Sequence, residues 1–309
     1  MAFADLKNDF VFRRIFATHP DILRGLLNDL LDRRDEETIV SLEYLPSEQL
    51  PLVLGAKLSI LDVRCKDRAG TTFVVEMQLI HVPGFINRVV YNACKAYVSQ
   101  LKAGAKYTDL VDVVAISICD FELWPDAQQE QQKLPLVPML SRWNMTERKS
   151  GSPGLLQVQY AFLELPKLPE RKPEMGAAYW AWLFVHAPEL REIPPDLPQG
   201  PFREALELAD KATFSQEELD AYQKVFDEIQ QVRDLADAKW AEGKAEGKTE
   251  GQVENAARNL LTVLRVRGLA VPDAARERIL AEKDPARLER WHERAILAAS
   301  AAEVIDDPS

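Results

Sequence analysis

Two acidic side chains and one amide lie on two neighbouring segments that both have the composition of β-strands. The first segment, KLSILDVRCK, contains Asp62, and the second, TFVVEMQLI, contains Glu76 and Gln78. The segment DRAGT between them is typical of a turn, so the pair predicts a β-hairpin. A turn centred on Ala69 places Asp62 opposite Glu76, with their Cβ atoms about 5 Å apart. Since Glu76 and Gln78 are two positions apart, all three side chains are expected on one face.

Two carboxylates at this distance repel each other unless a positive charge lies between them. A hard divalent cation with oxygen ligands is a common solution, which makes Asp62 and Glu76 candidate metal ligands. The alternative is a solvated hairpin face whose acidic residues have no such role. Glu76 and Gln78 interrupt an otherwise apolar run, FVVEMQLI, and this argues for a functional site.

The segment 85–103 has the apolar period of a helix and offers basic residues next to the hairpin. Its expected apolar face consists of Ile86, Val89, Val90, Ala93, Tyr97 and Leu101. Its expected polar face, ahead of a stop at Gly104, consists of Arg88, Asn92, Lys95, Ser99 and Lys102. Arg88, Lys95 and Lys102 form one stripe, which suits contacts with the phosphates of a nucleic-acid backbone.

The remaining segments of the first two thirds alternate between helix and strand. Residues 1 to 45 are expected to be helical, with an amphipathic segment that contains Asp9 and a second helix that begins at Pro20. The run LVDVVAISIC at 110–119 is nearly all apolar, as expected of a strand buried on both faces. A further strand is expected at 155–165. Strands that alternate with helices indicate an α/β fold.

The last third has a different character. Proline is frequent from 166 to 201, and the chain beyond 202 is expected to be helical, including the repeat AEGK-AEGK-TEGQ at 241–252. The expected domains are an α/β domain at 1–190, a linker and connecting helix at 191–255, and a helical module at 256–309. Apolar residues of this module, Leu260, Leu264, Ile279 and Trp291 among them, supply either a small bundle or an interface with a second copy.

Composition narrows the function classes. The net charge of −11 argues against a non-specific nucleic-acid binder, which usually carries a basic face. It does not exclude an enzyme that acts on DNA through bound divalent cations, because the metal reverses the local charge. The separate cysteines contain no CxxC pair, which argues against a disulfide framework and a zinc knuckle. No segment approaches the roughly 18 apolar residues of a membrane span, and none resembles a signal peptide, so a cytoplasmic protein without membrane contact is expected.

Several segments, taken in order, resemble a known family of bacterial nucleases. An acid on one strand followed by E-x-K or E-x-Q on the next resembles the PD-(D/E)xK nuclease superfamily. The chain is more similar still to the recombination-promoting nuclease and transposase family within it. The resemblance covers nearly the whole chain and is carried by NDFVFRRIF, LDVRCKDRAGTTFVVEMQ, AYVSQLKAGAKYTDLVDVVAISICDFEL, FLELPKL and RLERWHERAILAASAAEVI.

This resemblance implies a restriction-endonuclease-like core, with a mixed central sheet flanked by helices, and an all-helical C-terminal region. It also implies cleavage of DNA phosphodiester bonds with Mg²⁺ or Mn²⁺, in a role linked to recombination or mobile elements. Asp62 and Glu76 would bind the metal, and Asp9 matches the superfamily's accessory acid on the first helix. Asp9 is alternatively a helix-start carboxylate that complements the helix dipole.

Gln78 departs from the superfamily pattern, in which a lysine usually stands at this position. A lysine ammonium can hold the attacking water and offset phosphate charge, whereas an amide is neutral. Lys95, on the following helix, is the better candidate to supply the missing charge. The alternative is a catalytically degenerate member that acts as a binding or assembly module. A homodimer through the C-terminal helices would suit an enzyme that cuts two strands, and the sequence leaves it open.

Overall fold

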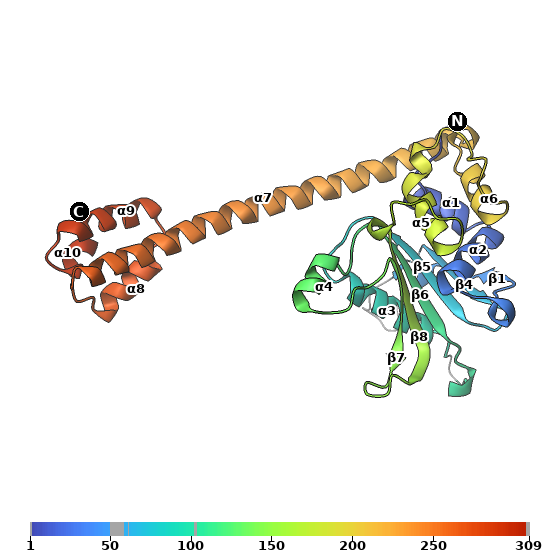
Figure 1. Cartoon of the computed structure of the whole chain (residues 1–309), viewed down its shortest axis with the longest axis horizontal. Helices are drawn as coiled ribbons and strands as arrows, with labels where there is room; N and C mark the ends of the chain where they lie inside the picture. Colours follow the sequence, from blue (N-terminus) through green and yellow to red (C-terminus); the bar gives the residue numbers. More distant parts are fainter. Residues whose placement is uncertain (1, 50–58, 61, 102–103, 307–309) are drawn as a thin grey trace. The chain divides into compact units, whose positions relative to one another are not determined.

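In the computed structural model of the chain, a mixed sheet of six strands lies at the centre of the first part (Figure 1). The strands are β1 (Leu42–Tyr44), β4 (Val63–Asp67), β5 (Thr72–Gln78), β6 (Val113–Cys119), β7 (Leu140–Thr146) and β8 (Pro153–Glu164). Their order across the sheet is β1-β4-β5-β6-β8-β7. β6 is parallel to both β5 and β8, and the other neighbours are antiparallel. A separate pair joins β2 (Glu48–Gln49) to β3 (Ser59–Ile60).

The structure describes residues 2–49, 59–60, 62–101 and 104–306. The chain divides into two compact units, Met1–Phe226 and Asp227–Ser309. The boundary between the units falls inside helix α7 (Gln216–Val266). The domain limits expected at residues 190 and 255 stay predictions.

The hairpin of β4 and β5 has the register that a turn at Ala69 predicts, with Val63 paired to Val75. Gly70 follows in this turn with a φ of +93°, a conformation that glycine adopts without the strain a Cβ would bring. β6, next to β5, is buried at all 7 of its residues, as its apolar run predicts for a strand inside the parallel part of the sheet. The sequence therefore predicts the centre of the sheet correctly.

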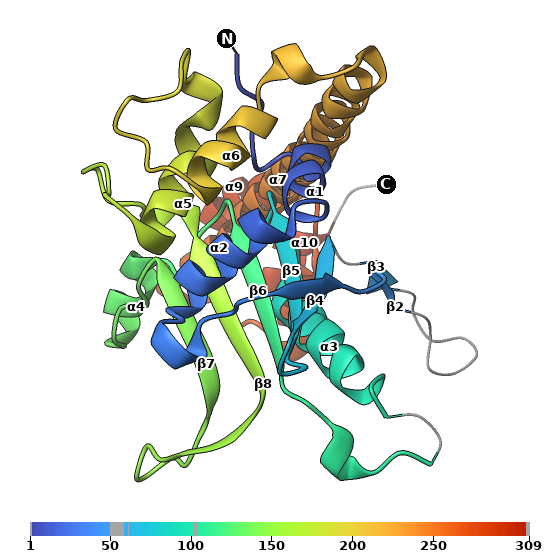
Figure 2. The same cartoon turned by 90° about the vertical axis from the view of Figure 1, so that its right-hand side faces the viewer.

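Helices cover both faces of the sheet (Figure 2). The helices of the first unit before α7 are α1 (Asp9–Phe16), α2 (Pro20–Leu31), α3 (Phe85–Val98), α4 (Asp126–Gln132), α5 (Gly176–His186) and α6 (Pro201–Leu208). One face packs against α1, α2, α5 and α6, and we call it the α1–α2 face; the other packs against α3, and we call it the α3 face. Along β5, Val75 belongs to the core of the α1–α2 face and Val74 to that of the α3 face. This is the helix-flanked mixed sheet that the resemblance implies.

Two N-terminal helices form within the segment predicted to be helical, but the prediction of helix up to residue 45 is wrong, because no α-helix follows α2 in residues 32–45 and Leu42–Tyr44 form β1. Asn8 caps α1, since its side-chain oxygen accepts a hydrogen bond of 3.1 Å from the backbone N–H of Phe10. The Asn8 amide also donates to the carbonyl of Tyr222 at 3.1 Å, which joins α1 to the beginning of α7. α2 begins at Pro20, as predicted, and buries Ile22, Leu23, Leu26, Leu27 and Leu30.

The orientation of α3 confirms one part of its predicted apolar face, since Val89 and Ala93 are buried, and corrects the rest. Asn92 and Lys95, expected on an outer polar face, are each only 4 % exposed. Ile86 and Val90, expected inside, are 44 % and 39 % exposed. The reason is Glu76, which is buried on the α3 face of β5 and needs polar partners there. The helix also ends at Val98, earlier than the stop predicted at Gly104.

The second unit is helical, as predicted. Its described residues contain most of α7, from Asp227 onward, followed by α8 (Asp273–Ala281), α9 (Pro285–Leu297) and α10 (Ala301–Ile305). Its core is formed by fully buried side chains that include Leu260, Leu264, Ile279 and Trp291. The predicted bundle core therefore forms within a single chain. No helix in the described part of the protein has the length and apolar character that a membrane crossing requires.

A close contact between α2 and α6 provides a test of this packing. A Cβ on Gly25 would lie 2.6 Å from Pro201 Cγ. Gly25→Ala should therefore lower the free energy of unfolding by about 1–3 kcal/mol, although alanine is the better helix former. Urea denaturation measures this change. In a Pro201→Gly background, which removes both Pro201 Cγ and the Pro201 Cβ that would lie 2.8 Å away, the same substitution should lose most of its effect, and equal losses in both backgrounds would contradict the clash.

Candidate functional site

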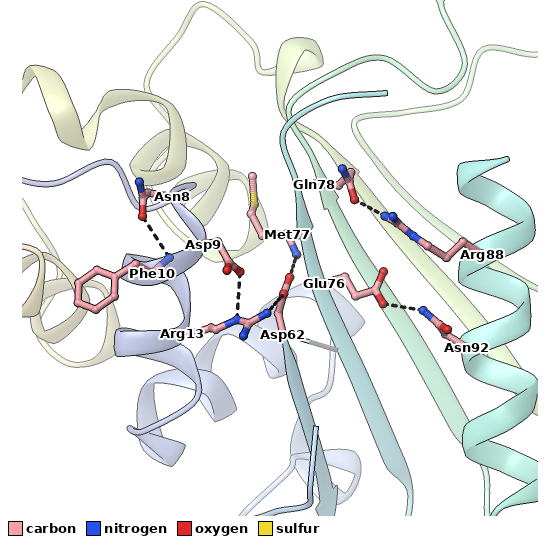
Figure 3. Close-up of polar contacts among 10 residues, drawn as sticks. All are labelled: Asn8, Asp9, Phe10, Arg13, Asp62, Glu76, Met77, Gln78, Arg88 and Asn92. Carbon is pink, nitrogen blue, oxygen red and sulfur yellow. Dashed lines mark hydrogen bonds and ion pairs between the residues drawn. The ribbon is translucent and has the colours of Figure 1, made fainter. Parts of the chain in front are cut away.

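The predicted site residues Asp9, Asp62, Glu76, Gln78 and Arg88 fall into two polar clusters on opposite sides of β5 (Figure 3). The Asp62 cluster consists of the side chains of Asp9, Arg13 and Asp62 with the backbone N–H of Met77. The Glu76 cluster consists of the side chains of Glu76, Gln78, Arg88 and Asn92. Figure 3 shows Asp62 directed toward α1 and Glu76 directed toward α3.

In the Asp62 cluster, one carboxylate connects a strand to a helix. Asp62 Oδ2 accepts a hydrogen bond of 2.7 Å from the N–H of Met77 on β5. Asp62 Oδ1 accepts a second one, of 3.0 Å, from Arg13 Nη2. Arg13 Nε in turn donates to Asp9 Oδ1 at 3.0 Å. The guanidinium of Arg13 therefore lies between two carboxylates, and its planar fork serves both.

Burial and charge act against each other in this cluster. Burial, reinforced by the charge of Asp9, raises the pKa of Asp62 to about 7. The Met77 N–H and the Arg13 guanidinium act in the opposite direction but do not outweigh burial. Burial also opposes the charge on Arg13, yet the carboxylates of Asp9 and Asp62 outweigh it and raise the pKa of Arg13. The protonation state of Asp62 is therefore set by its burial, by the charges of Asp9 and Arg13 and by the N–H of Met77.

In the Glu76 cluster, α3 supplies polar partners to a buried carboxylate. Glu76 is 8 % exposed, and its Oε1 accepts a hydrogen bond of 2.9 Å from Asn92 Nδ2. Burial raises the pKa of Glu76, while the charge of Arg88 and the Asn92 hydrogen bond act in the opposite direction. Gln78 uses both ends of its amide, since Nε2 donates to the Ile80 carbonyl at 3.1 Å and Oε1 accepts from Arg88 Nη2.

The structure brings Glu76 and Gln78 to one side of the sheet, as predicted, but it does not bring Asp62 there. Asp62 lies at a bend just before β4, where the alternation of side chains along a strand no longer fixes their direction. The Met77 N–H and Arg13 hold its carboxylate on the side of α1 instead. The expected convergence of the three side chains is therefore corrected, and the metal-binding role of Asp62 and Glu76 stays a prediction.

The predicted basic residues have different surroundings. Lys95 is buried, and its ammonium lies 5.7 Å from the centre of the Tyr91 ring. Arg88 is exposed and contacts Gln78. Lys102 lies outside the described residues. Arg88 is thus a cation in direct contact with Gln78, and the phosphate contacts expected of all three residues stay predictions.

Two contacts of the site were not part of the sequence prediction, namely the contact of Arg13 with Asp62 and that of Asn92 with Glu76. In each contact the unpredicted residue lies four positions after a predicted one on the same helix: Arg13 follows Asp9, and Asn92 follows Arg88. Residues with this spacing lie next to each other on a helix. The sequence therefore contains an indication of both contacts, namely a polar residue one helical turn from a predicted site residue.

The oxygens of the two clusters are of the type that a divalent cation prefers, but their carboxylates lie apart. In the described part of the chain, no three His, Cys, Asp or Glu side chains gather into a metal-binding group. Asp9 and Asp62 nevertheless hold a positive charge between them, the guanidinium of Arg13. Their oxygens, like those of Glu76, are the hard donors that Mg²⁺ and Mn²⁺ prefer.

The fold and the acidic hairpin together define the class of protein. A mixed six-stranded sheet flanked by helices, with carboxylates at its β4–β5 hairpin, is a PD-(D/E)XK nuclease-like fold. Residues 6–237 match the family described as PD-(D/E)XK nuclease family transposase, and the chain belongs to this family. Membership supports a nuclease- or transposase-like function. No curated protein and no solved structure matches the chain.

The burial of Asp62 predicts a dependence of stability on pH. Because the fold raises the pKa of Asp62 from 3.8 to about 7, the folded state binds this proton more tightly than the unfolded state. The contribution of Asp62 to the free energy of unfolding is therefore fully present below pH 3.8 and is lost as the pH rises through 7. Asp62→Asn should flatten this decline, measured by urea denaturation in EDTA across the same range.

The matched control for this prediction is Glu43→Gln, which neutralises an exposed acid on β1 that pairs with Lys66. This variant should retain the decline of the wild-type protein. An Asp62→Asn variant that loses stability between pH 4 and 7 as steeply as the wild type would contradict the assignment of the proton to Asp62.

Proposed function

We propose that the chain is a metal-dependent DNA endonuclease that hydrolyses phosphodiester bonds in a role linked to recombination or mobile elements. The observation that carries the proposal is the pair of largely buried carboxylates, Asp62 and Glu76, at the central hairpin of a chain from a nuclease family. A buried carboxylate is unfavourable unless it is compensated, so its presence in the sheet supports a functional role.

Asp62 and Glu76 would hold Mg²⁺ or Mn²⁺, with Asp9 as an accessory acid. The bound cation would activate a water molecule and neutralise charge on the phosphate. Asp62 accepts a hydrogen bond from the N–H of Met77, the residue after Glu76 on β5. The peptide group between Glu76 and Met77 therefore links the two acidic side chains. Arg13 balances the charges of Asp9 and Asp62. These contacts keep the acidic side chains in place at one end of the hairpin.

Arg88, Lys95 and Lys102 would contact DNA phosphates, and a homodimer through the C-terminal helices would bring two sites to two strands. The three free cysteines support a reducing compartment, the bacterial cytoplasm.

A second candidate function is a catalytically degenerate nuclease fold that acts as a binding or assembly module. Two observations favour it, namely the neutral amide at Gln78 and the separate partners of Asp62 and Glu76. This function predicts partner binding without cleavage under any metal.

Plasmid nicking tests the proposed activity. The wild-type protein with Mg²⁺ or Mn²⁺ should convert supercoiled plasmid to nicked and linear forms, and EDTA should abolish this conversion. Asp62→Asn and Glu76→Gln should each lower the rate by about 100-fold or more, because each removes one charge from the site.

Glu43→Gln serves again as the control, since it removes one exposed charge from the neighbouring strand β1 and should retain the wild-type rate. Nicking that survives both site substitutions would contradict the assigned site. Absence of nicking by folded wild-type protein with either metal would favour the binding or assembly function.

A further inference from the structure

We propose that Gln78 and Arg88 act as a pair, in which Gln78 orients Arg88 and Arg88 supplies the positive charge that contacts a DNA phosphate. The inference rests on the proposed function, whose substrate is a DNA phosphodiester. It makes Gln78 a positioning residue that acts through Arg88, and it assigns to Arg88 the charge that the sequence places at Lys95.

The amide of Gln78 is arranged to present an acceptor to Arg88. Its Nε2 donates to the carbonyl of Ile80 at 3.1 Å, which determines the direction in which the amide points. Its Oε1 is then directed to α3, where it accepts a hydrogen bond from Arg88 Nη2. A lysine at this position would offer no acceptor and would place a second positive charge beside the guanidinium.

Arg88 has the surroundings expected of a phosphate contact. Its side chain is exposed, and its guanidinium carbon lies 5.5 Å from the centre of the Phe85 ring, a second contact that restricts its position. A guanidinium carries five N–H donors, and the bond to Gln78 uses one of them. The planar fork is also the group best matched to a phosphate in two-point contacts.

The charge of Arg88 also acts on the buried part of the cluster. It opposes the rise that burial causes in the pKa of Glu76, so the two charges are close enough to interact. Arg88 therefore lies between the buried carboxylate of Glu76 and the solvent-exposed surface, from which DNA must approach. Lys95 lies buried on the same helix and has no such access.

Binding of a short fluorescent DNA duplex in Ca²⁺, a hard cation used here in place of Mg²⁺, measures this contact apart from cleavage. Arg88→Ala should weaken binding about 10-fold or more, as expected for one charge-assisted hydrogen bond. It should also reduce the slope of log affinity against log salt by about 1, the effect of one lost phosphate contact. Arg88→Lys, which keeps the charge, should retain the wild-type slope.

The pairing itself is tested by a double-mutant cycle. Gln78→Leu should weaken binding by a smaller factor than Arg88→Ala, and the double variant should bind no more weakly than Arg88→Ala alone. Arg171→Ala is the matched control, because it removes a 90 % exposed arginine outside the cluster and should leave the salt slope unchanged.

Additive effects of Gln78→Leu and Arg88→Ala would show that the two residues act independently, which overturns the pairing. An Arg88→Ala variant with the affinity and salt slope of a DNA-binding wild type would overturn the role of Arg88 and leave the proposed function intact. A folded wild-type protein that does not bind DNA would overturn both.

Discussion

Burial of the Glu76 carboxylate against α3 is the constraint on which the arrangement of the site depends. A carboxylate removed from water requires hydrogen bonds or positive charge around it, and Asn92 and Arg88 provide both from one helix. To present them, α3 turns Asn92 toward β5 and leaves Arg88 at the surface. Ile86 and Val90 then lie on the outside. The carboxylate and the apolar residues that α3 adds to the core of this face together determine how the helix is rotated.

The acidic residues lie in two environments on opposite sides of β5, and in each environment an arginine offsets the negative charge of the carboxylates. Toward α1, Arg13 compensates Asp9 and Asp62, and toward α3, Arg88 compensates Glu76. Both environments depend on the register of this strand, because a shift by one residue would exchange its faces. The hydrogen bond from the N–H of Met77 to Asp62 fixes the end of the hairpin where the two environments meet.

The sequence predicts those helices and strands whose order of apolar and polar residues follows from burial alone. The apolar run of β6 and the turn at Ala69 predict the centre of the sheet, whereas β1 and β7 are not predicted. β1 has only 3 residues, and β7 is an edge strand whose residues after Ser141 are exposed, so neither carries a continuous apolar run. The direction of Asp62 and the rotation of α3 depend on contacts between elements, and no local periodicity contains that information.

In the proposed site, the amide at position 78 leaves the positive charge to Arg88, so that the charge is retained at a different residue. The guanidinium of Arg88 lies near the beginning of α3, at the positive end of the helix dipole, which is an unfavourable place for a cation. An arginine there destabilises the helix unless acceptors or anions offset its charge. Gln78 supplies a neutral acceptor and Glu76 a buried anion. A phosphate would be a second anion, attracted by the guanidinium and by the helix terminus together, and this complementarity favours a site that binds nucleic acid over an inert remnant of one.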